Sequence, residues 1–221
     1  MKPAIQWWSN TPDAPTGYGT QTKAVVDRLV AAGFPVSISA NFGQQAVTGI
    51  YLTPSGGEVP VYPQGYDGYS QDVIYRHYQD WSRRHPDVPT VLVTLFDAWV
   101  LKNRNLANID TIVSWMPIDH LPTPPAVMQW AKQGNVVPVA MSQYGRDQLH
   151  KADIEAAYIP HTIEDVFAPR VGARDIIDVP DGAFLVMMNA ANKGTAPTRK
   201  AWSENLMALS LFMEQHDDVF V

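Results

Sequence analysis

The sequence contains no cysteine among its 221 residues, which excludes disulfide frameworks and thiolate metal sites. It has no apolar segment that approaches the roughly 20 residues of a membrane span. The apolar run at the amino terminus covers only residues 4–8 and is too short for a signal peptide. We therefore expect a cytoplasmic protein with no transmembrane segment.

Charged residues are also scarce. They make up 17% of the chain, whose formal net charge is −6, and no long basic run is present. We expect no nucleic-acid binding, because that function requires a basic surface. The six histidines lack the spacing of metal ligands, so we expect no metal site. The 46% of hydrophobic residues is enough for one large core or two smaller ones.

Short apolar runs alternate with helical patterns in the first part of the chain. The runs that predict buried strands are residues 4–8, 35–39, 49–52, 59–63, 90–95, 111–116 and 136–141. Helical patterns fall near 20–32, 70–81, 97–107, 123–133 and 142–152, and Ser70 is a candidate N-cap for the second of them. This alternation predicts an α/β fold: a Rossmann-like, doubly wound parallel sheet over residues 1–168.

The pattern begins again after residues 169–182, which we interpret as a linker. The strand pattern 183–188 is followed by a helix through Trp202, Leu206, Leu209 and Met213 and then by the strand-like ending "DVFV". Residues 183–221 therefore predict the first β-α-β part of a second Rossmann-like domain, truncated at Val221. The alternative is that this part extends the first sheet.

A glycine-rich stretch, "PTGYGTQTK" at residues 15–23, joins the first strand to the first helix. Gly17 and Gly19 match the first two glycines of a dinucleotide fingerprint, but Thr22 occupies the third position. The second strand ends near Asn41, where an NAD site requires an acidic residue. A helix start after glycines suits an anionic ligand, and the alternative is a tight turn with no ligand.

Three stretches acquire meaning together: "APTGYGTQTKAVVDRLVAAGFPVSI" (14–38), "YIPHTIEDVFAP" (158–169) and "FLVMMNAANKGTAPTRKAWSENLMALSLFMEQHDDVFV" (184–221). In this order they resemble retaining glycosyltransferases of the GT-B fold, the large family 4 or group 1 type. The resemblance implies transfer of a sugar from a nucleotide-diphosphate sugar, such as a UDP- or GDP-sugar, to an unidentified acceptor. It implies no cofactor and no metal ion. The chain corresponds to about the first half of such an enzyme, so we expect this fragment to be inactive.

The resemblance also implies roles for particular residues. Gly17 and Gly19 would line the interdomain cleft near the donor diphosphate or the acceptor. Arg199 and Lys200 match the basic pair that grips the donor diphosphate, with Lys193 as a third cation. Many members carry an arginine where this chain has Asn189 and Ala190, which is a departure from the family pattern. The alternative for the basic residues is a solvated helix start.

His120 takes the position of the family's catalytic-site histidine, after the strand 111–116. Tyr18, Asp97 and Asp119 are candidate contacts to the acceptor or the sugar, because they follow strands at the expected ligand-binding edge. For His120 the alternative is packing within the loop. Asp97 could instead cap the following helix, and Asp119 could either orient the imidazole or cap the next turn.

Two other histidines have simpler expected roles: His77 packs on an apolar helix face, and His161 shapes the passage into the second domain. Two further function classes remain open beside the glycosyltransferase. One is a non-catalytic Rossmann-like module that binds a sugar or a nucleotide. The other is an NAD-dependent oxidoreductase, which Thr22 and Asn41 disfavour.

Overall fold

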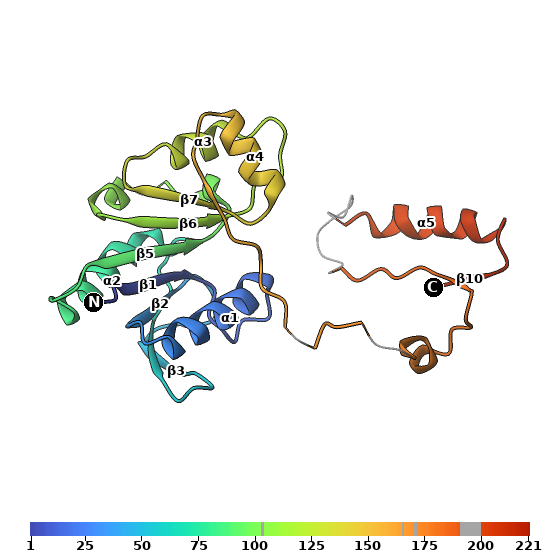
Figure 1. Ribbon diagram of the computed structural model, residues 1–221, viewed down its shortest axis with the longest axis horizontal. Helices are drawn as coiled ribbons and strands as arrows, with labels where there is room; N and C mark the ends of the chain where they lie inside the picture. The colour runs from blue at the N-terminus through green and yellow to red at the C-terminus, as the bar shows by residue number, and fades with distance from the viewer. Residues whose placement is uncertain (103, 165, 170–171, 191–199) are drawn as a thin grey trace. The chain divides into compact units, whose positions relative to one another are not determined.

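The computed structural model describes residues 1–102, 104–164, 166–169, 172–190 and 200–221 (Figure 1). The chain divides into two compact units, unit 1 (residues 1–163) and unit 2 (residues 164–221). The strands of unit 1 are β1 (Ala4–Ser9), β2 (Val36–Ala40), β3 (Gly49–Leu52), β4 (Glu58–Tyr62), β5 (Thr90–Leu95), β6 (Ile112–Met116), β7 (Val136–Ala140) and β8 (Ala157–Tyr158). Its helices are α1 (Gly17–Ala31), α2 (Gln71–Arg84), α3 (Pro125–Ala131) and α4 (Gln143–Lys151).

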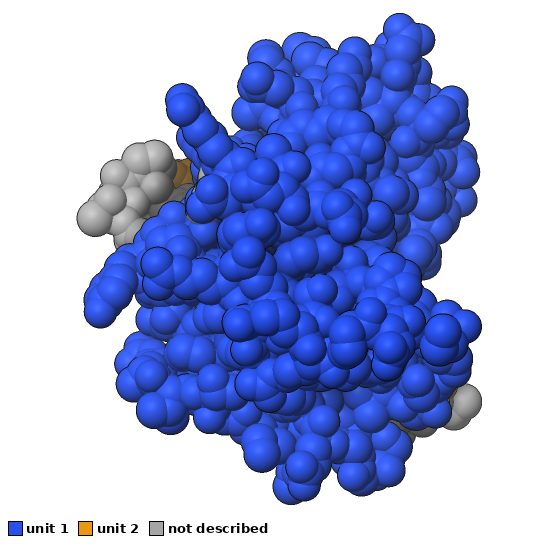
Figure 2. All heavy atoms as spheres, turned by 90° about the vertical axis from the view of Figure 1, so that its left-hand side faces the viewer, with its two compact units in different colours: residues 1–163 blue, residues 164–221 orange. Residues whose placement is uncertain are grey.

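The strands of unit 1 form one eight-stranded sheet with the order β3-β4-β2-β1-β5-β6-β7-β8. Neighbouring strands are parallel except β3 and β4, which form an antiparallel hairpin. An α/β fold with a mostly parallel central sheet is therefore confirmed, and its architecture is compatible with a Rossmann-like fold. Figure 2 shows unit 1 as one continuous body, seen from the side on which the N-terminus lies in Figure 1.

Side chains along β1 point alternately to the two faces of the sheet, so β1 contributes to the buried cluster on each face. Ile5 and Trp7 pack with Val26 of α1 in one buried cluster. Trp8 packs on the other face, in a cluster that includes Ile74 of α2 and residues of α3 and α4. Because helices cover both faces, the central strands are almost wholly buried, as is typical of parallel sheets.

One predicted helix, near 97–107, is replaced by two short 3-10 turns, Ala98–Val100 and Arg104–Asn108. Leu101 ends the first turn with extended backbone (ψ 101°). Leu101 and Leu106 are both buried in the core. The demand for burial at these two positions interrupts the helix. The two-residue strand β8 follows no recognisable sequence pattern.

Helix α1 begins at Gly17, three residues before the predicted start, because Thr16 caps it. The Thr16 Oγ1 atom accepts a hydrogen bond from the Gly19 N–H at 3.0 Å. Gly19 is buried, and a Cβ atom there would overlap the carbonyl oxygen of Ala14 and crowd that of Thr11. The first turn of α1 therefore lies directly on the loop that follows β1, which only glycine permits.

Substitution of the two glycines by alanine should have opposite effects. Gly19→Ala should lower the free energy of unfolding by about 1–3 kcal/mol, because the backbone of the 11–14 loop must move. Gly17→Ala should be neutral or stabilising by up to about 1 kcal/mol, since no atom lies within 4 Å of the added Cβ. Urea unfolding monitored by tryptophan fluorescence measures both values. Equal effects of the two substitutions would show that the close contact at Gly19 is unimportant.

Helix α2 starts differently from the prediction, because Ser70 does not cap it. Ser70 has positive φ (59°), and its hydroxyl donates to the Ala40 carbonyl at 3.0 Å. The Asp67 carboxylate instead accepts from the backbone N–H of Gln71 at 3.1 Å and of Tyr69 at 2.6 Å. The cap thus comes from the preceding loop and leaves Ser70 free to fasten α2 to the end of β2.

His77 of α2 is packed against the sheet, as predicted. Its ring stacks on Tyr62 with a centroid distance of 4.7 Å, and its Nδ1 lies 3.0 Å from Ser39 Oγ. Ser39 Oγ accepts from Gln6 Nε2 at 2.7 Å, and its own hydrogen is available to Nδ1 of a neutral His77. Burial lowers the pKa of His77 to about 4, although Asp80 and Asp72 act in the opposite direction.

The lowered pKa predicts a specific loss of stability in acid. Between pH 6.5 and about 4 the unfolded chain binds more protons at His77 than the folded chain, so the free energy of unfolding falls as pH falls. His77→Asn retains an acceptor for Ser39 but cannot titrate, so the fall should be smaller by about 2 kcal/mol. Urea unfolding at a series of pH values measures the slopes, and identical slopes would contradict the assignment.

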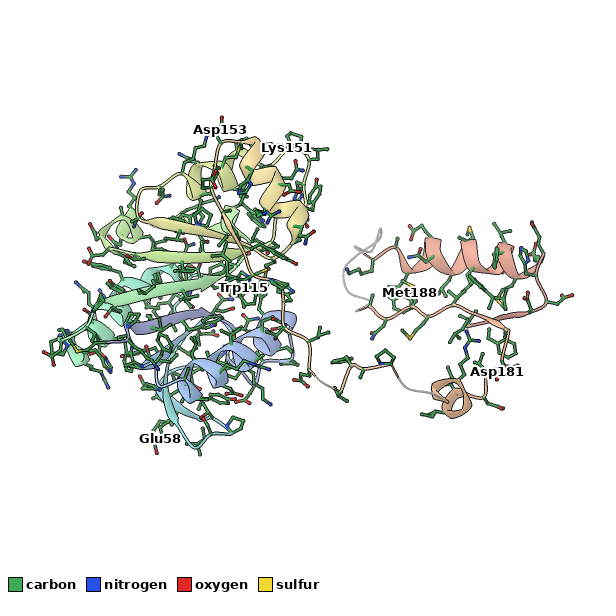
Figure 3. The ribbon with its side chains drawn as sticks, in the orientation of Figure 1. Glu58, Trp115, Lys151, Asp153, Asp181 and Met188 are labelled. Carbon is green, nitrogen blue, oxygen red and sulfur yellow. The ribbon has the colours of Figure 1, made fainter. Side chains whose placement is uncertain are left out.

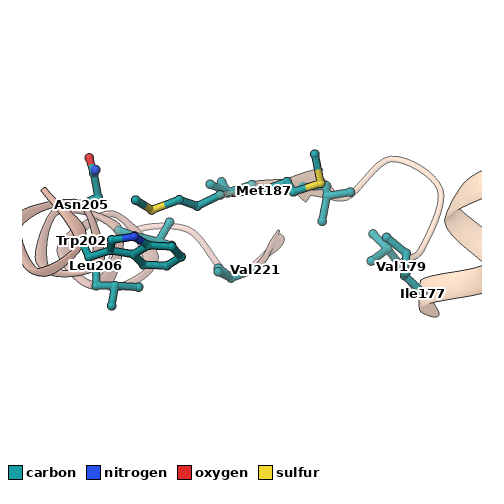
Figure 4. A pocket seen from close by; sticks show the side chains of 11 residues that line it. Ile177, Val179, Met187, Trp202, Asn205, Leu206 and Val221 are labelled. Atoms are coloured by element: carbon teal, nitrogen blue, oxygen red, sulfur yellow. The ribbon is translucent and has the colours of Figure 1, made fainter. Parts of the chain in front are cut away.

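Unit 2 contains the 3-10 turn Ala173–Ile177, the strands β9 (Phe184–Leu185) and β10 (Val219–Phe220), and the helix α5 (Trp202–Met213). β9 and β10 are parallel neighbours, and β9 is much shorter than the predicted strand 183–188. An apolar pocket of about 760 Å³ lies between α5 and these strands, as the side chains of Trp202, Leu206 and Val221 show in Figure 4. No residue of α5 is buried.

No helix within the described ranges combines the length and the apolar character that a bilayer crossing requires.

Candidate functional site

The candidate residues of unit 1 meet at the carboxyl edge of the sheet, where parallel strands commonly present ligand-binding loops. β5 is followed by Asp97, and β6 is followed by Asp119 and His120. These three residues line one hollow of about 10 Å³, room for about one water molecule. The remaining lining residues are Trp99, Pro117, Ile118, Pro124 and Val127.

Asp97 is held by Tyr18 from the first turn of α1. The Tyr18 hydroxyl donates to Asp97 Oδ2 at 3.2 Å. Burial, and then the negative charge of Asp97, raise the pKa of Tyr18, so the phenol remains a protonated donor. Asp97 makes no side-chain capping bond to the turn that follows it, so the alternative that it caps a helix there is not what the structure shows. Its carboxylate is instead tied to the helix that starts beside β1.

Asp119 contacts the imidazole of His120, with 2.5 Å between Asp119 Oδ1 and His120 Nδ1. Both side chains are exposed, at 76% and 66%, so a ligand can reach them. A carboxylate at Nδ1 fixes the orientation of the ring and leaves Nε2 as the nitrogen that can meet a ligand. The structure thus places Asp119 where it orients the imidazole, one of the two roles that the sequence left open.

Two asparagines and a threonine join the ends of β1 and β2 to the start of α1. Asn10 Nδ2 donates to Thr16 Oγ1 at 2.7 Å, and Asn41 Nδ2 donates to Asn10 Oδ1 at 3.1 Å. Sequence reasoning missed Asn10 and Thr16 as site residues, although their position between a strand and a helix was a usable signal. Asn41 therefore helps to hold the first turn of α1 in place, through Asn10 and Thr16.

Thr22 occupies the position of the third fingerprint glycine and has a packing role. It is fully buried, and its Oγ1 accepts from the indole N–H of Trp7 at 3.0 Å. A dinucleotide fingerprint has a glycine, without a side chain, at this position. Here the Thr22 side chain instead joins α1 to β1 through a hydrogen bond. The combination of Thr22 and Asn41 weakens the dinucleotide interpretation further.

The predicted basic residues belong to unit 2. Lys200 is exposed, and its carbonyl oxygen accepts from Asn205 Nδ2 at 3.1 Å. Arg199 and Lys193 lie outside the described residues. Among the residues that are described, no three His, Asp or Glu side chains gather closely enough to hold a metal ion.

The last segment of unit 1 is fastened to α1 and β6. Gln21 donates through Nε2 to the Thr162 carbonyl at 2.9 Å and accepts from the Thr162 N–H at 2.8 Å. The indole of Trp115 donates to the Ile159 carbonyl at 2.8 Å, and its ring meets His161 edge to face. The position of Trp115 in unit 1 can be followed in Figure 3. The sequence contained no signal for the contact between Gln21 and Thr162, which are far apart along the chain.

Comparison of the sequence with protein-family models and with curated proteins finds no match.

Gln21→Glu should destabilise unit 1 in a pH-dependent way. The substitution keeps the acceptor for the Thr162 N–H but removes the donor to the Thr162 carbonyl, at a cost of about 1–3 kcal/mol near neutral pH. Protonation of the new carboxyl in acid restores a donor, so the cost should shrink as the pH falls. Urea unfolding at two pH values tests this, with the exposed Gln79→Glu as the control. A cost independent of pH would contradict the proposed pairing.

Proposed function

We propose that the chain is the acceptor-side part of a retaining glycosyltransferase of the GT-B fold, which moves a sugar from a nucleotide-diphosphate sugar to an acceptor. The observation that carries this proposal is that Asp97, Asp119 and His120 lie together at the carboxyl edge, where the exposed Asp119 and His120 can meet a ligand larger than the hollow between them. Tyr18, from the glycine-rich start of α1, donates a hydrogen bond to Asp97 of this group.

These side chains suit a sugar. Hydroxyl groups need both donors and acceptors, and the two carboxylates accept while the His120 Nε2 can do either, depending on its protonation. The transition state of sugar transfer resembles an oxocarbenium ion, and nearby carboxylates stabilise its positive charge. His120, oriented by Asp119, is proposed as the residue that contacts the reacting sugar.

The leaving diphosphate requires the opposite charge. The N–H groups of Gly17 and Tyr18 have no partner within α1, because they belong to its first turn, and the helix dipole favours an anion there. The family resemblance, and not a placement of unit 2, assigns the neutralising positive charge to Arg199 and Lys200. No metal ion is required for this arrangement.

The proposal predicts which ligands perturb which residues. In ¹H–¹⁵N spectra of the chain, UDP- or GDP-sugars should shift the amides of Gly17, Tyr18 and His120, with a dissociation constant of about 1 mM or weaker. NAD also carries a diphosphate, so any shift that it causes should be confined to Gly17 and Tyr18, and the amide of His120 should stay unchanged. A response to NAD alone would favour the oxidoreductase, and no response to any of these compounds would count against both.

Turnover separates an enzyme from a binding module. In a form of the protein that contains the whole of the proposed second domain, His120→Ala should lower sugar transfer, or hydrolysis of the donor, about 100-fold, as is usual for a positioned catalytic group. His85→Ala, at the end of α2, should leave the rate unchanged and serves as the matched control. If ligand binding is observed but His120→Ala has no kinetic effect, the site binds without the proposed chemistry.

A further inference from the structure

The edge strand β3 presents an unprotected sheet edge. β3 is the first strand in the sheet order, so no described strand pairs with its outer side. Ile50 and Leu52 are 64% and 66% exposed. Residues 42–57 contain no charged side chain, although natural proteins usually protect such edges with charge, bulges or covering segments.

The opposite edge of the same sheet is protected. β8 has only two residues, and Lys151, Asp153 and Glu155 precede it in the chain. Figure 3 shows Lys151 and Asp153 at the end of unit 1 farthest from Glu58, which begins β4 beside β3. The contrast indicates that the neutral, apolar character of the β3 edge is specific to that edge.

The hydrogen-bonding groups of β3 alternate between the two sides. The Thr53 N–H donates to the Gly57 carbonyl at 2.9 Å. The backbone N–H and C=O groups of the odd-numbered residues of β3 therefore point toward β4. Ile50 pairs with Pro60, which has no N–H to offer. By the alternation of an antiparallel ladder, the N–H and C=O groups of Ile50 and Leu52 point to the open side.

We propose that this edge pairs with the β3 edge of a second copy of the chain, antiparallel and about a twofold axis at Tyr51. In this register Ile50 faces Leu52 of the other copy, and each pair exchanges two backbone hydrogen bonds. The four apolar side chains meet on one face, and Tyr51 remains anchored to α1 by its 2.9 Å bond to Asp27. The partner is self-complementary, as a closed twofold interface requires.

Charge favours a second copy at this edge over other surfaces. Two chains that each carry a net charge of −6 repel one another. The segment 42–57 contributes no charged side chain to such a contact, and the carboxylates that act on Tyr51 are those of Asp27 and Asp13, outside this segment. A larger sheet of two paired units follows, with the carboxyl edge of each unit left free.

The absence of cysteine allows a direct test by cross-linking. The Tyr51 pair at the axis is a non-hydrogen-bonded pair with Cα atoms roughly 4.5 Å apart, within the range for a disulfide. Under oxidation Tyr51→Cys should therefore form a dimer of twice 24.5 kDa that a reducing agent dissociates. Ser55→Cys, in the turn of the same hairpin, is the matched control, because its two copies would lie roughly 26 Å apart. A monomeric Tyr51→Cys, or equal cross-linking of both variants, would overturn the proposal.

Sedimentation of the unmodified chain supplies an independent measurement. We expect a monomer–dimer equilibrium, and Leu52→Lys should raise its dissociation constant roughly tenfold or more, since lysine blocks edge pairing. Met207→Lys, at an exposed apolar position of α5 (68%), should leave the equilibrium unchanged. A chain that stays monomeric at all concentrations, or that responds to Met207→Lys and not to Leu52→Lys, would overturn the proposal.

Discussion

The close approach of Gly19 to the loop after β1 is the contact on which the candidate site depends. A side chain at this position would overlap the Ala14 carbonyl oxygen and crowd that of Thr11, so α1 could not begin where it does. The Thr16 cap and the Asn10 hydrogen bond hold the same junction. Because α1 starts there, Tyr18 reaches Asp97. The absence of a side chain at Gly19 therefore lets the start of α1 lie beside the end of β1 and reach Asp97 after β5. Asp97 lines the same hollow as His120.

Much of unit 1 could be predicted from the sequence, because its strands are short apolar runs separated by helical patterns. The core strands are almost continuously buried, and burial on both faces is what produces such runs. Prediction failed where tertiary contacts overruled local pattern. Burial of Leu101 and Leu106 converted a helical pattern into two turns. Asp67 replaced Ser70 as the cap of α2, because Ser70 was drawn to the Ala40 carbonyl.

The candidate site was predictable in part, for the same physical reason. Asp97, Asp119 and His120 follow strands, and parallel strands deliver the residues after them to one edge. The bond between Tyr18 and Asp97 and the pairing of Gln21 with Thr162 could not be predicted, since each joins residues distant in sequence through side-chain geometry. The roles of Gly17, Gly19, His120, Arg199 and Lys200 in sugar transfer remain predictions, as do the domain boundaries.

The central position of β1 has a consequence for the order in which the chain can fold during synthesis. β1 is made first, yet it pairs with β2 on one side and with β5 on the other. Its second side stays open until residues 90–95 have left the ribosome. Until then Trp8, which is fully buried in the finished unit, lacks the ring of Phe96, against which it packs at a centroid distance of 5.0 Å. Such a transiently exposed apolar strand is the kind of segment that chaperones protect.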